Sequence, residues 1–112
     1  MTDKTWKAAE RAIARALGGV RVGPTGEATP DVESDWLSVE VKTRKRLPDW
    51  LLEAMQQAHA NRRGDRLAVV ILHQVGARHD DDLVLLRLAD FRDHFVGTNL
   101  SAQSRKDKLL GG

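Results

Sequence analysis

The sequence has 112 residues, of which 18 are basic and 16 acidic, with 41% hydrophobic and 30% charged content. These values are typical of one soluble globular domain with a single modest core. The lack of cysteine excludes disulfides, zinc–thiolate sites and thiol nucleophiles. The N-terminus is amphipathic and unlike a signal peptide, and the longest apolar run, 67–72, is too short to span a bilayer. We therefore expect a cytoplasmic protein without membrane association.

The first half of the chain predicts one helix followed by short strands. Apolar residues recur at helical spacing over 5–17, and a Gly-Gly pair then ends the helix. Glu10 lies on the apolar stripe of this helix, which is an unusual place for an acid. A short extended piece and a loop rich in glycine, proline and threonine come next. Residues 31–42 predict a hairpin that turns near Ser34 and Asp35.

The second half predicts a helix, two strands and a short closing helix. The helix covers 48–63, the strands cover 67–73 and 83–88, and the closing helix covers 89–95. Because both strands are continuous apolar runs, we expect a sheet that is covered on both faces. The predicted fold class is therefore α/β, a minimal α/β/α sandwich with a central mixed sheet of about five strands. The polar segment 97–112 lacks periodicity and is predicted to be a flexible tail.

The hairpin carries a candidate metal site. Alternate side chains of a strand share a face, so Glu40 and Lys42 point the same way. A two-residue turn would place Asp31 diagonal to Glu40, at about 7–8 Å between backbones, so that both carboxylates reach one ion. Mg²⁺ prefers such oxygen ligands, and Lys42 is positioned to stabilise charge on a phosphate. Glu10 is able to reach the same cluster from the first helix.

Other polar residues have competing interpretations. The basic block 42–46 is either a solvated surface or a contact for a polyanion, and its overlap with Lys42 favours the polyanion. His73 and His79 are interpreted as loop polarity instead of metal ligands, and the aspartates 80–82 as a polar hairpin tip. A glutamate two residues before a lysine is common in strands, so a chance match competes with the metal site. For the two tryptophans at 36 and 50, base stacking and core or dimer packing both stay open.

Three of these features together resemble a known family. The helix residue Glu10, the Pro-Asp pair at 30–31 and the Glu-Val-Lys stretch at 40–42 are similar to the PD-(D/E)XK nuclease pattern, in the family's order. More narrowly, residues 4–95 resemble the archaeal-type Holliday junction resolvases, including small versions encoded by phages. That resemblance implies a restriction-endonuclease-like nuclease domain over 1–96.

The loop before the Pro-Asp pair also follows the resolvase pattern, with two departures. It reads "RVGPTG", with Thr25 where the family has a serine and with an extra residue after Arg21. A glutamine on the helix after the Glu-x-Lys strand faces the family's active site, and Gln57 is the preferred match, with Gln56 as the alternative. Thr25 keeps the hydroxyl group of the serine found in the family.

The resemblance implies a Mg²⁺-dependent endodeoxyribonuclease, with Mn²⁺ as a substitute, that resolves four-way DNA junctions in recombination and repair. A homodimer is expected because a junction has approximate two-fold symmetry and needs paired cuts. Another repair nuclease of this superfamily and a non-catalytic DNA-binding module are the alternatives. The implied catalytic residues are Glu10, Thr25, Asp31, Glu40, Lys42 and Gln57; the metal ligands are Glu10, Asp31, Glu40 and the Val41 carbonyl; the DNA contacts are Arg21, Arg44, Lys45 and Arg46.

Overall fold

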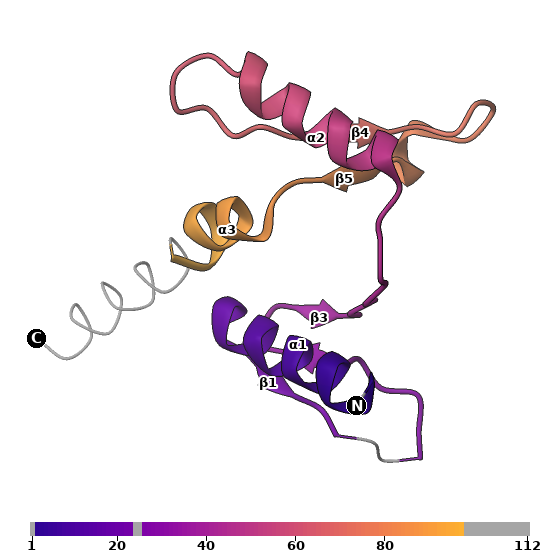
Figure 1. The fold of residues 1–112 in the computed structure, drawn as a ribbon, viewed down its shortest axis with the longest axis vertical. Coiled ribbons are helices and arrows are strands. Elements are labelled where there is room, and N and C mark those ends of the chain that lie inside the picture. The colour runs from indigo at the N-terminus through magenta and orange to yellow at the C-terminus, as the bar shows by residue number, and fades with distance from the viewer. Residues whose placement is uncertain (1, 24–25, 98–112) are drawn as a thin grey trace, which may run out of the picture. The chain divides into compact units, whose positions relative to one another are not determined.

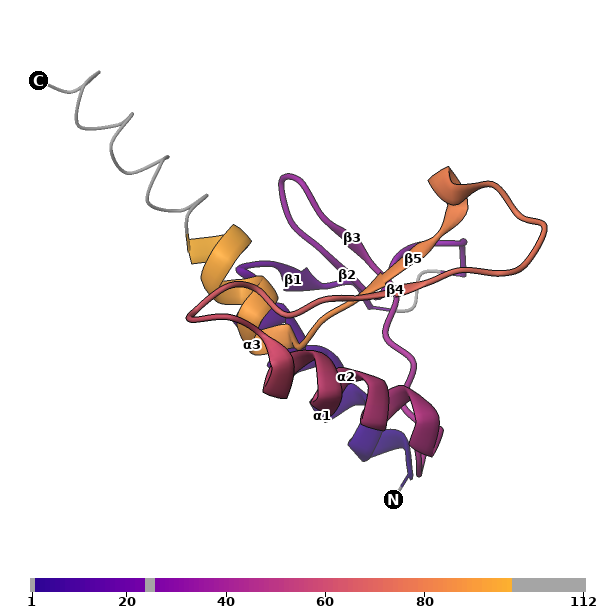
Figure 2. The ribbon, with the colours of Figure 1, turned by 90° about the horizontal axis from the view of Figure 1, so that it is seen from above.

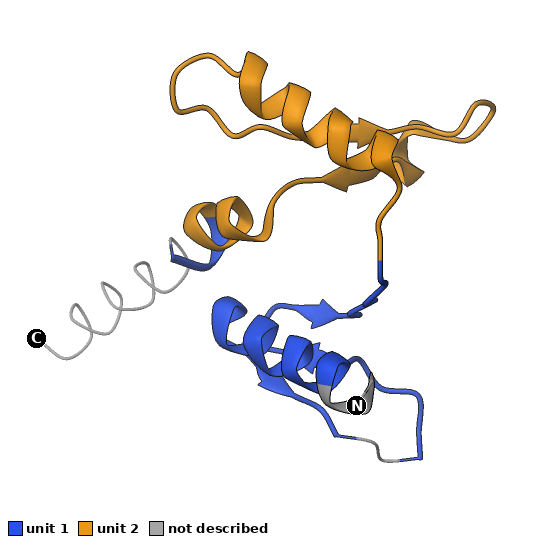
Figure 3. Cartoon of the chain, in the orientation of Figure 1, with its two compact units in different colours: residues 1–45, 95–112 blue, residues 46–94 orange. Residues whose placement is uncertain are grey.

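The computed structural model of the protein describes residues 2–23 and 26–97, with side chains from residue 5 onward. Two compact units make up the chain (Figure 3). The first unit consists of residues 1–45 and 95–112, and the second consists of residues 46–94. Each unit has its own helix and its own small antiparallel sheet.

In the first unit, a helix packs on a three-stranded antiparallel sheet (Figure 1). The helix α1 spans Thr2–Leu17, and the strands are β1 (Val20–Arg21), β2 (Val32–Glu33) and β3 (Ser38–Val39), in the order β1-β2-β3. The amphipathic pattern of the sequence therefore predicted α1 correctly. Its apolar stripe contacts β1 and β2. The buried apolar side chains of this unit are Ala14, Leu17, Val32 and Val96.

The two glycines after α1 end the helix in a Schellman motif. Gly18 adopts a φ of 66°, and its N–H donates to the Arg15 carbonyl at 3.4 Å. The N–H of Gly19 donates to the Ala14 carbonyl at 2.9 Å, so both glycines satisfy carbonyls of the last turn. Gly19 also approaches β2 closely, because a Cβ built there would lie 2.6 Å from the Glu33 carbonyl oxygen. The chain can pass from α1 into the sheet this tightly only where the side chain is absent.

The predicted hairpin forms, but its turn lies one residue later than expected. Val32 pairs with Val39, and the Ser34 N–H donates to the Leu37 carbonyl at 3.0 Å. This register places Ser34 opposite Leu37, so the two turn residues are Asp35 and Trp36, one position later than the predicted 34–35. The Ser34 hydroxyl accepts the Leu37 N–H at 3.2 Å, and this side-chain bond closes the turn.

The ladder between β2 and β3 ends earlier than predicted, just before the Glu-x-Lys stretch. The Asp31 N–H donates to the Val39 carbonyl at 2.9 Å. The next donor, the Val41 N–H, binds the Asp31 carboxylate instead, at 2.7 Å from Oδ2. A side-chain oxygen thus takes the place of a backbone acceptor, and residues 40–43 lie beyond the last residue of β3.

In the second unit, a long helix accompanies a two-stranded antiparallel sheet, and the short α3 (Leu88–Phe91) follows later in the chain (Figure 2). The helix α2 spans Asp49–Asn61 and contacts β4. It ends two residues before the predicted end, because Arg62 adopts extended dihedrals of −63° and 148°. The strands β4 (Val70–Leu72) and β5 (Leu83–Leu85) pair with Leu72 opposite Leu83. Both are shorter than the predicted apolar runs.

The closing helix is confirmed as α3 (Leu88–Phe91), followed by a further helical stretch, Arg92–Val96. Over the described ranges the protein is thus α/β, with three helices labelled α and two small antiparallel sheets. The expected single mixed sheet of about five strands is not confirmed. Residues 98–112, most of the predicted tail, lie outside the described residues. No helix in the described part of the chain is long and apolar enough to cross a membrane.

Candidate functional site

Four predicted catalytic residues line one pocket of the first unit. The pocket has a volume of about 360 Å³ and is open to solvent. The wall from α1 carries Glu10, the entry to β2 carries Asp31, and the segment after β3 carries Glu40 and Lys42. Residues separated by more than 30 positions in the sequence therefore meet at one place. The remaining lining residues are Trp6, Val41, Thr43 and Arg44.

Glu10 is buried and paired with an arginine. Only 5% of the residue is exposed, and Arg21 donates from Nε to its Oε2 at 2.6 Å. The Arg21 guanidinium also lies 5.7 Å from the centre of the Trp6 ring, within the range of a cation–π contact. Because a buried carboxylate is costly without a partner, the pair explains how the apolar stripe of α1 accommodates an acid.

Asp31 is half-buried and has capacity left for a further partner. Its Oδ2 accepts the Val41 N–H at 2.7 Å. A carboxylate has about four acceptor positions over its two oxygens, so one N–H bond leaves room for a cation. The bond also orients the side chain toward the segment that carries Glu40 and Lys42. The Val41 amide therefore helps to hold the Asp31 carboxylate in position.

Glu40 and Lys42 form a loose surface pair. Lys42 Nζ lies 3.9 Å from Glu40 Oε2, and the side chains are 71% and 60% exposed. Exposed pairs of this kind contribute little to stability, so neither side chain is fixed by the other. Val39 and Val41 are half-buried while Glu40 and Lys42 are exposed, as the predicted alternation requires. Both polar groups can therefore turn toward a ligand in the pocket.

The three pocket acids do not gather around one point. Within residues 2–23 and 26–97, the group of three ligating side chains whose atoms all lie within 4.8 Å is His73, His79 and Asp82. Glu10 is instead satisfied by Arg21, and Asp31 by the Val41 amide. The expected convergence of carboxylates would need the exposed Glu40 side chain to turn toward Asp31.

The other predicted residues lie in different places. Thr25 lies outside the described residues, and Gln57 and Gln56 are exposed on α2 in the second unit. Arg44 is exposed and lines the pocket. Lys45 is exposed as well, whereas Arg46 pairs with Asp49 at 2.9 Å in the second unit. Arg21 was predicted to contact DNA, and in the structure its Nε binds Glu10.

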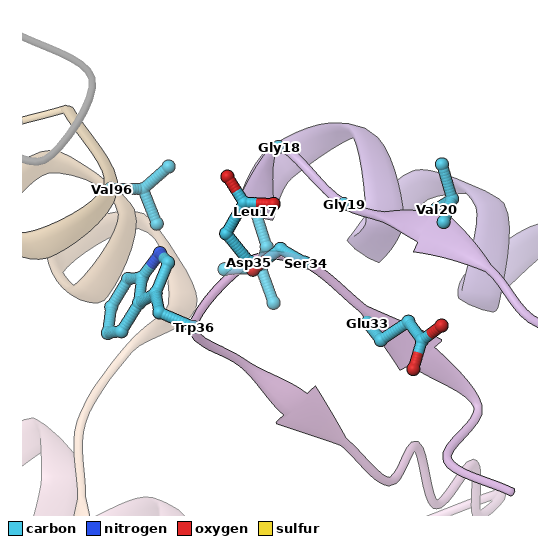
Figure 4. Close-up of a pocket in the computed structure, with 9 residues that line it drawn as sticks. All are labelled: Leu17, Gly18, Gly19, Val20, Glu33, Ser34, Asp35, Trp36 and Val96. Atoms are coloured by element: carbon cyan, nitrogen blue, oxygen red, sulfur yellow. The ribbon is translucent and has the colours of Figure 1, made fainter. Parts of the chain in front are cut away.

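A second pocket of the first unit contains none of the predicted catalytic residues (Figure 4). It has a volume of about 230 Å³ and lies between the end of α1 and the loop from β2 to β3. Trp36 lines this pocket and is 46% exposed. The full lining is Leu17, Gly18, Gly19, Val20, Glu33, Ser34, Asp35, Trp36 and Val96.

The sequence interpretation missed a polar cluster in the second unit. His73 and His79 both contact Asp82, although they were interpreted as separate loop residues. The hairpin register could have revealed this cluster. Since Leu72 pairs with Leu83, the next step of the hairpin brings residue 73 toward residue 82.

Comparisons of the chain with known protein families, with curated proteins and with solved structures found no match.

Proposed function

We propose that the protein is a Mg²⁺-dependent endodeoxyribonuclease of the PD-(D/E)XK type that cuts four-way DNA junctions. One observation carries the proposal: Glu10, Asp31, Glu40 and Lys42 line a single pocket. These residue types, in this order along the chain, are the ones that the nuclease pattern requires. A pocket open to solvent is also accessible to a phosphodiester backbone.

The donor set of the pocket fits a hard divalent cation. Asp31 and Glu40 offer carboxylate oxygens, and the Val41 carbonyl is a further oxygen donor in the same wall. Mg²⁺ is usually held by one or two carboxylates together with water, and Mn²⁺ accepts similar ligands. When bound, such an ion supplies a Lewis acid for phosphodiester hydrolysis. Asp31 and Glu40 would hold it, and Glu10 would contribute through its second oxygen.

Lys42 would act on the charge of the reacting phosphate. Its Nζ is only loosely tied to Glu40, at 3.9 Å, and its side chain is largely exposed. An ammonium at this point stabilises negative charge on phosphoryl oxygens and orients an attacking water through its N–H groups. Lys42 would therefore act as the catalytic lysine, and its place in the pocket lining and its exposure support this role.

Basic residues beside the pocket would bind the DNA backbone. Arg44 is part of the wall, and Lys45 follows it along the chain. Each phosphate that such a side chain neutralises adds to the salt dependence of binding. Arg46 would have to leave Asp49 and Arg21 would have to share its guanidinium with Glu10, so we expect weaker contributions from both. Thr25 and Gln57 would act as auxiliary groups.

The proposed function also implies a particular fold and a homodimer. A restriction-endonuclease-like α/β/α sandwich around one central sheet is the fold that this chemistry usually accompanies. Paired cuts in opposing strands need two active sites, which a two-fold homodimer of this chain would supply. Several apolar side chains of β4 and β5 are exposed, among them Ile71, Leu83 and Val84, and a second copy would cover such residues.

A non-catalytic DNA-binding module is the second candidate. It is favoured by the hydrogen bonds of two pocket acids, because Glu10 already binds Arg21 and Asp31 already binds the Val41 amide. A pure binding protein needs no acid–acid–lysine set next to a phosphate, since the acids repel it. Activity measurements therefore separate the two candidates.

The decisive experiment compares Asp31→Asn and Glu40→Gln with the wild type on a labelled four-way junction with Mg²⁺. We expect each change to lower the cleavage rate by at least about 100-fold, because an oxygen ligand of the ion loses its charge. Binding of the junction should stay within a few-fold. Glu33→Gln is the matched control, because Glu33 is an exposed acid of β2 outside this pocket.

Two results would contradict the nuclease proposal. The first is cleavage at the wild-type rate in the presence of EDTA. The second is binding of DNA without any cleavage by the wild type over a range of Mg²⁺ and Mn²⁺ concentrations. That second result would leave the binding-module candidate standing.

A further inference from the structure

A cluster of two histidines and one aspartate lies at the base of the loop between β4 and β5. Leu72 and Leu83 form the last pair of the hairpin, so His73 and Asp82 are the next residues on either side of the loop. A short 3₁₀ turn then brings His79 to the same place, and the Asp82 N–H donates to the His79 carbonyl at 3.0 Å. The cluster therefore joins both ends of the loop.

The contacts within the cluster are short and centre on the carboxylate. His73 Nδ1 lies 2.6 Å from Asp82 Oδ1, and His79 Nδ1 lies 3.2 Å from Asp82 Oδ2. The Asp82 side chain is 13% exposed, and the His73 side chain 34% exposed. Asp82 is thus the most buried of the three side chains, His73 is partly exposed, and the His79 side chain is 83% exposed.

We propose that His73, His79 and Asp82 bind one Zn²⁺ ion. Two imidazole nitrogens and one carboxylate are a common ligand set for zinc, whereas Mg²⁺ prefers oxygen alone. Bonds of about 2.0–2.1 Å in tetrahedral geometry separate neighbouring ligand atoms by about 3.3 Å. The ligand atoms of this cluster already lie within 4.8 Å of one another. This site is independent of the nuclease pocket and of its proposed function.

Binding the ion requires local movement of the side chains. The rings of His73 and His79 are stacked, with centroids 4.3 Å apart and 26° between their planes. An ion lies close to the plane of each imidazole that binds it, and two nearly parallel rings cannot share one ion in this way. The exposed His79 ring would have to turn away from its stack on His73. The His73 and Asp82 atoms, now 2.6 Å apart, would have to separate toward the distance of about 3.3 Å between two ligands that share an ion.

A hollow beside the cluster leaves room for a fourth ligand. It has a volume of about 370 Å³, and its lining includes His73 and Asp82. Zinc sites with three protein ligands keep an open position that a water molecule fills. The ion would tie the end of β4 to the start of β5 and to the turn between them. We therefore expect zinc to stabilise the loop 73–82.

The test uses the full-length chain without a histidine tag, freed of metal by dialysis against a chelating resin. Isothermal titration with ZnCl₂ should show one equivalent bound by the wild type, and titration with MgCl₂ should give the same isotherm for the wild type and for His79→Gln. His79→Gln should weaken zinc binding by at least about tenfold, because even the loss of a group that only supports a ligand costs 10–100-fold. Asp82→Asn should have a similar effect.

His59→Gln is the matched control. His59 lies on α2 and contacts Arg62, so the change removes an imidazole without touching the cluster. Zinc should raise the thermal unfolding midpoint of the wild type and of His59→Gln but not of His79→Gln. Circular dichroism of metal-free His79→Gln should match the wild type, since the side chain is exposed. If the wild type binds zinc no more tightly than His79→Gln, or if His59→Gln loses as much affinity, the cluster is a hydrogen-bonded loop anchor and the zinc proposal is wrong.

Discussion

Glu10 on α1 and Arg21 on β1 form a largely buried ion pair. The Glu10 side chain is 7% exposed and that of Arg21 is 22% exposed, with 2.6 Å between Nε and Oε2. We expect Arg21→Met to lower the free energy of unfolding by about 3 kcal/mol, because it leaves a buried carboxylate without its partner. Denaturant unfolding of the two proteins measures this difference.

A double-mutant cycle and an exposed pair provide the controls for that prediction. Glu10→Gln together with Arg21→Met should cost less than the sum of the single changes, since the two side chains interact directly. Arg46→Met removes an arginine from an exposed pair with Asp49 and should change stability by less than about 0.5 kcal/mol. Equal losses for Arg21→Met and Arg46→Met would show that the Glu10 pair is not a buried interaction.

The periodicity of the sequence located Glu10 on the apolar face of α1, because that face depends only on local spacing. It could not identify Arg21 as the partner. That contact depends on how β1 returns beneath the helix, which is a property of the assembled unit. The same limit applies to His73, His79 and Asp82. These residues come together because of the register of β4 and β5. The sequence interpretation did not extend that register to the loop residues.

Gly19 shows how closely α1 and the first sheet approach one another. A Cβ at this position would lie 2.6 Å from the Glu33 carbonyl oxygen and 3.3 Å from the Val32 Cγ1. Because the oxygen belongs to the backbone of β2, it cannot move aside without a shift of the strand. We expect Gly19→Ala to lower the free energy of unfolding by about 1–3 kcal/mol, the usual cost of overpacking.

The matched control for Gly19→Ala is Gly23→Ala. A Cβ at Gly23 meets nothing within 4 Å, and its backbone does not have a positive φ. The substitution there should change stability by no more than about 0.5 kcal/mol. Thermal or urea unfolding of both variants distinguishes the effect of the close approach from the general effect of alanine on the unfolded chain.

Helices were easier to predict than strands in this chain, for a physical reason. The helices α1 and α2 are set by local spacing and by their end signals, and both formed near the predicted bounds. The strand that was expected to carry Glu40 and Lys42 ends at Val39 instead. The Asp31 carboxylate accepts the next hydrogen bond of the ladder in place of a backbone carbonyl. The alternation of polar and apolar residues in the sequence gives no sign of this change.

For the whole molecule, the proposed function requires two copies to act together on one DNA. One pocket per chain supplies one cut, and a four-way junction is resolved only by two cuts in opposing strands. The amount of nicked DNA relative to linear DNA should therefore show whether one copy or a pair of copies makes the cuts. A supercoiled plasmid with an extruded inverted repeat reports the difference, because paired cuts give linear DNA and single cuts give a nicked circle.

We predict that the wild type gives mainly linear DNA in this assay, and that preparations co-expressed with an excess of the Asp31→Asn chain give mainly nicked circles. Mixed dimers would retain one functional site and would still bind the junction, because the change removes an ion ligand and leaves the basic residues Arg44 and Lys45 in place. Co-expression ensures that the chains exchange, and Glu33→Gln in place of Asp31→Asn is the control that should leave linear product dominant. If the ratio of linear to nicked DNA does not depend on the share of Asp31→Asn chains, the two cuts do not come from a pair of copies.

A competition assay tests the preference for branched DNA. Two active sites at a fixed separation can both engage only a branched substrate, so unlabelled junction should compete with labelled junction better than linear duplex does. If linear duplex competes equally well, the protein has no preference for branched DNA.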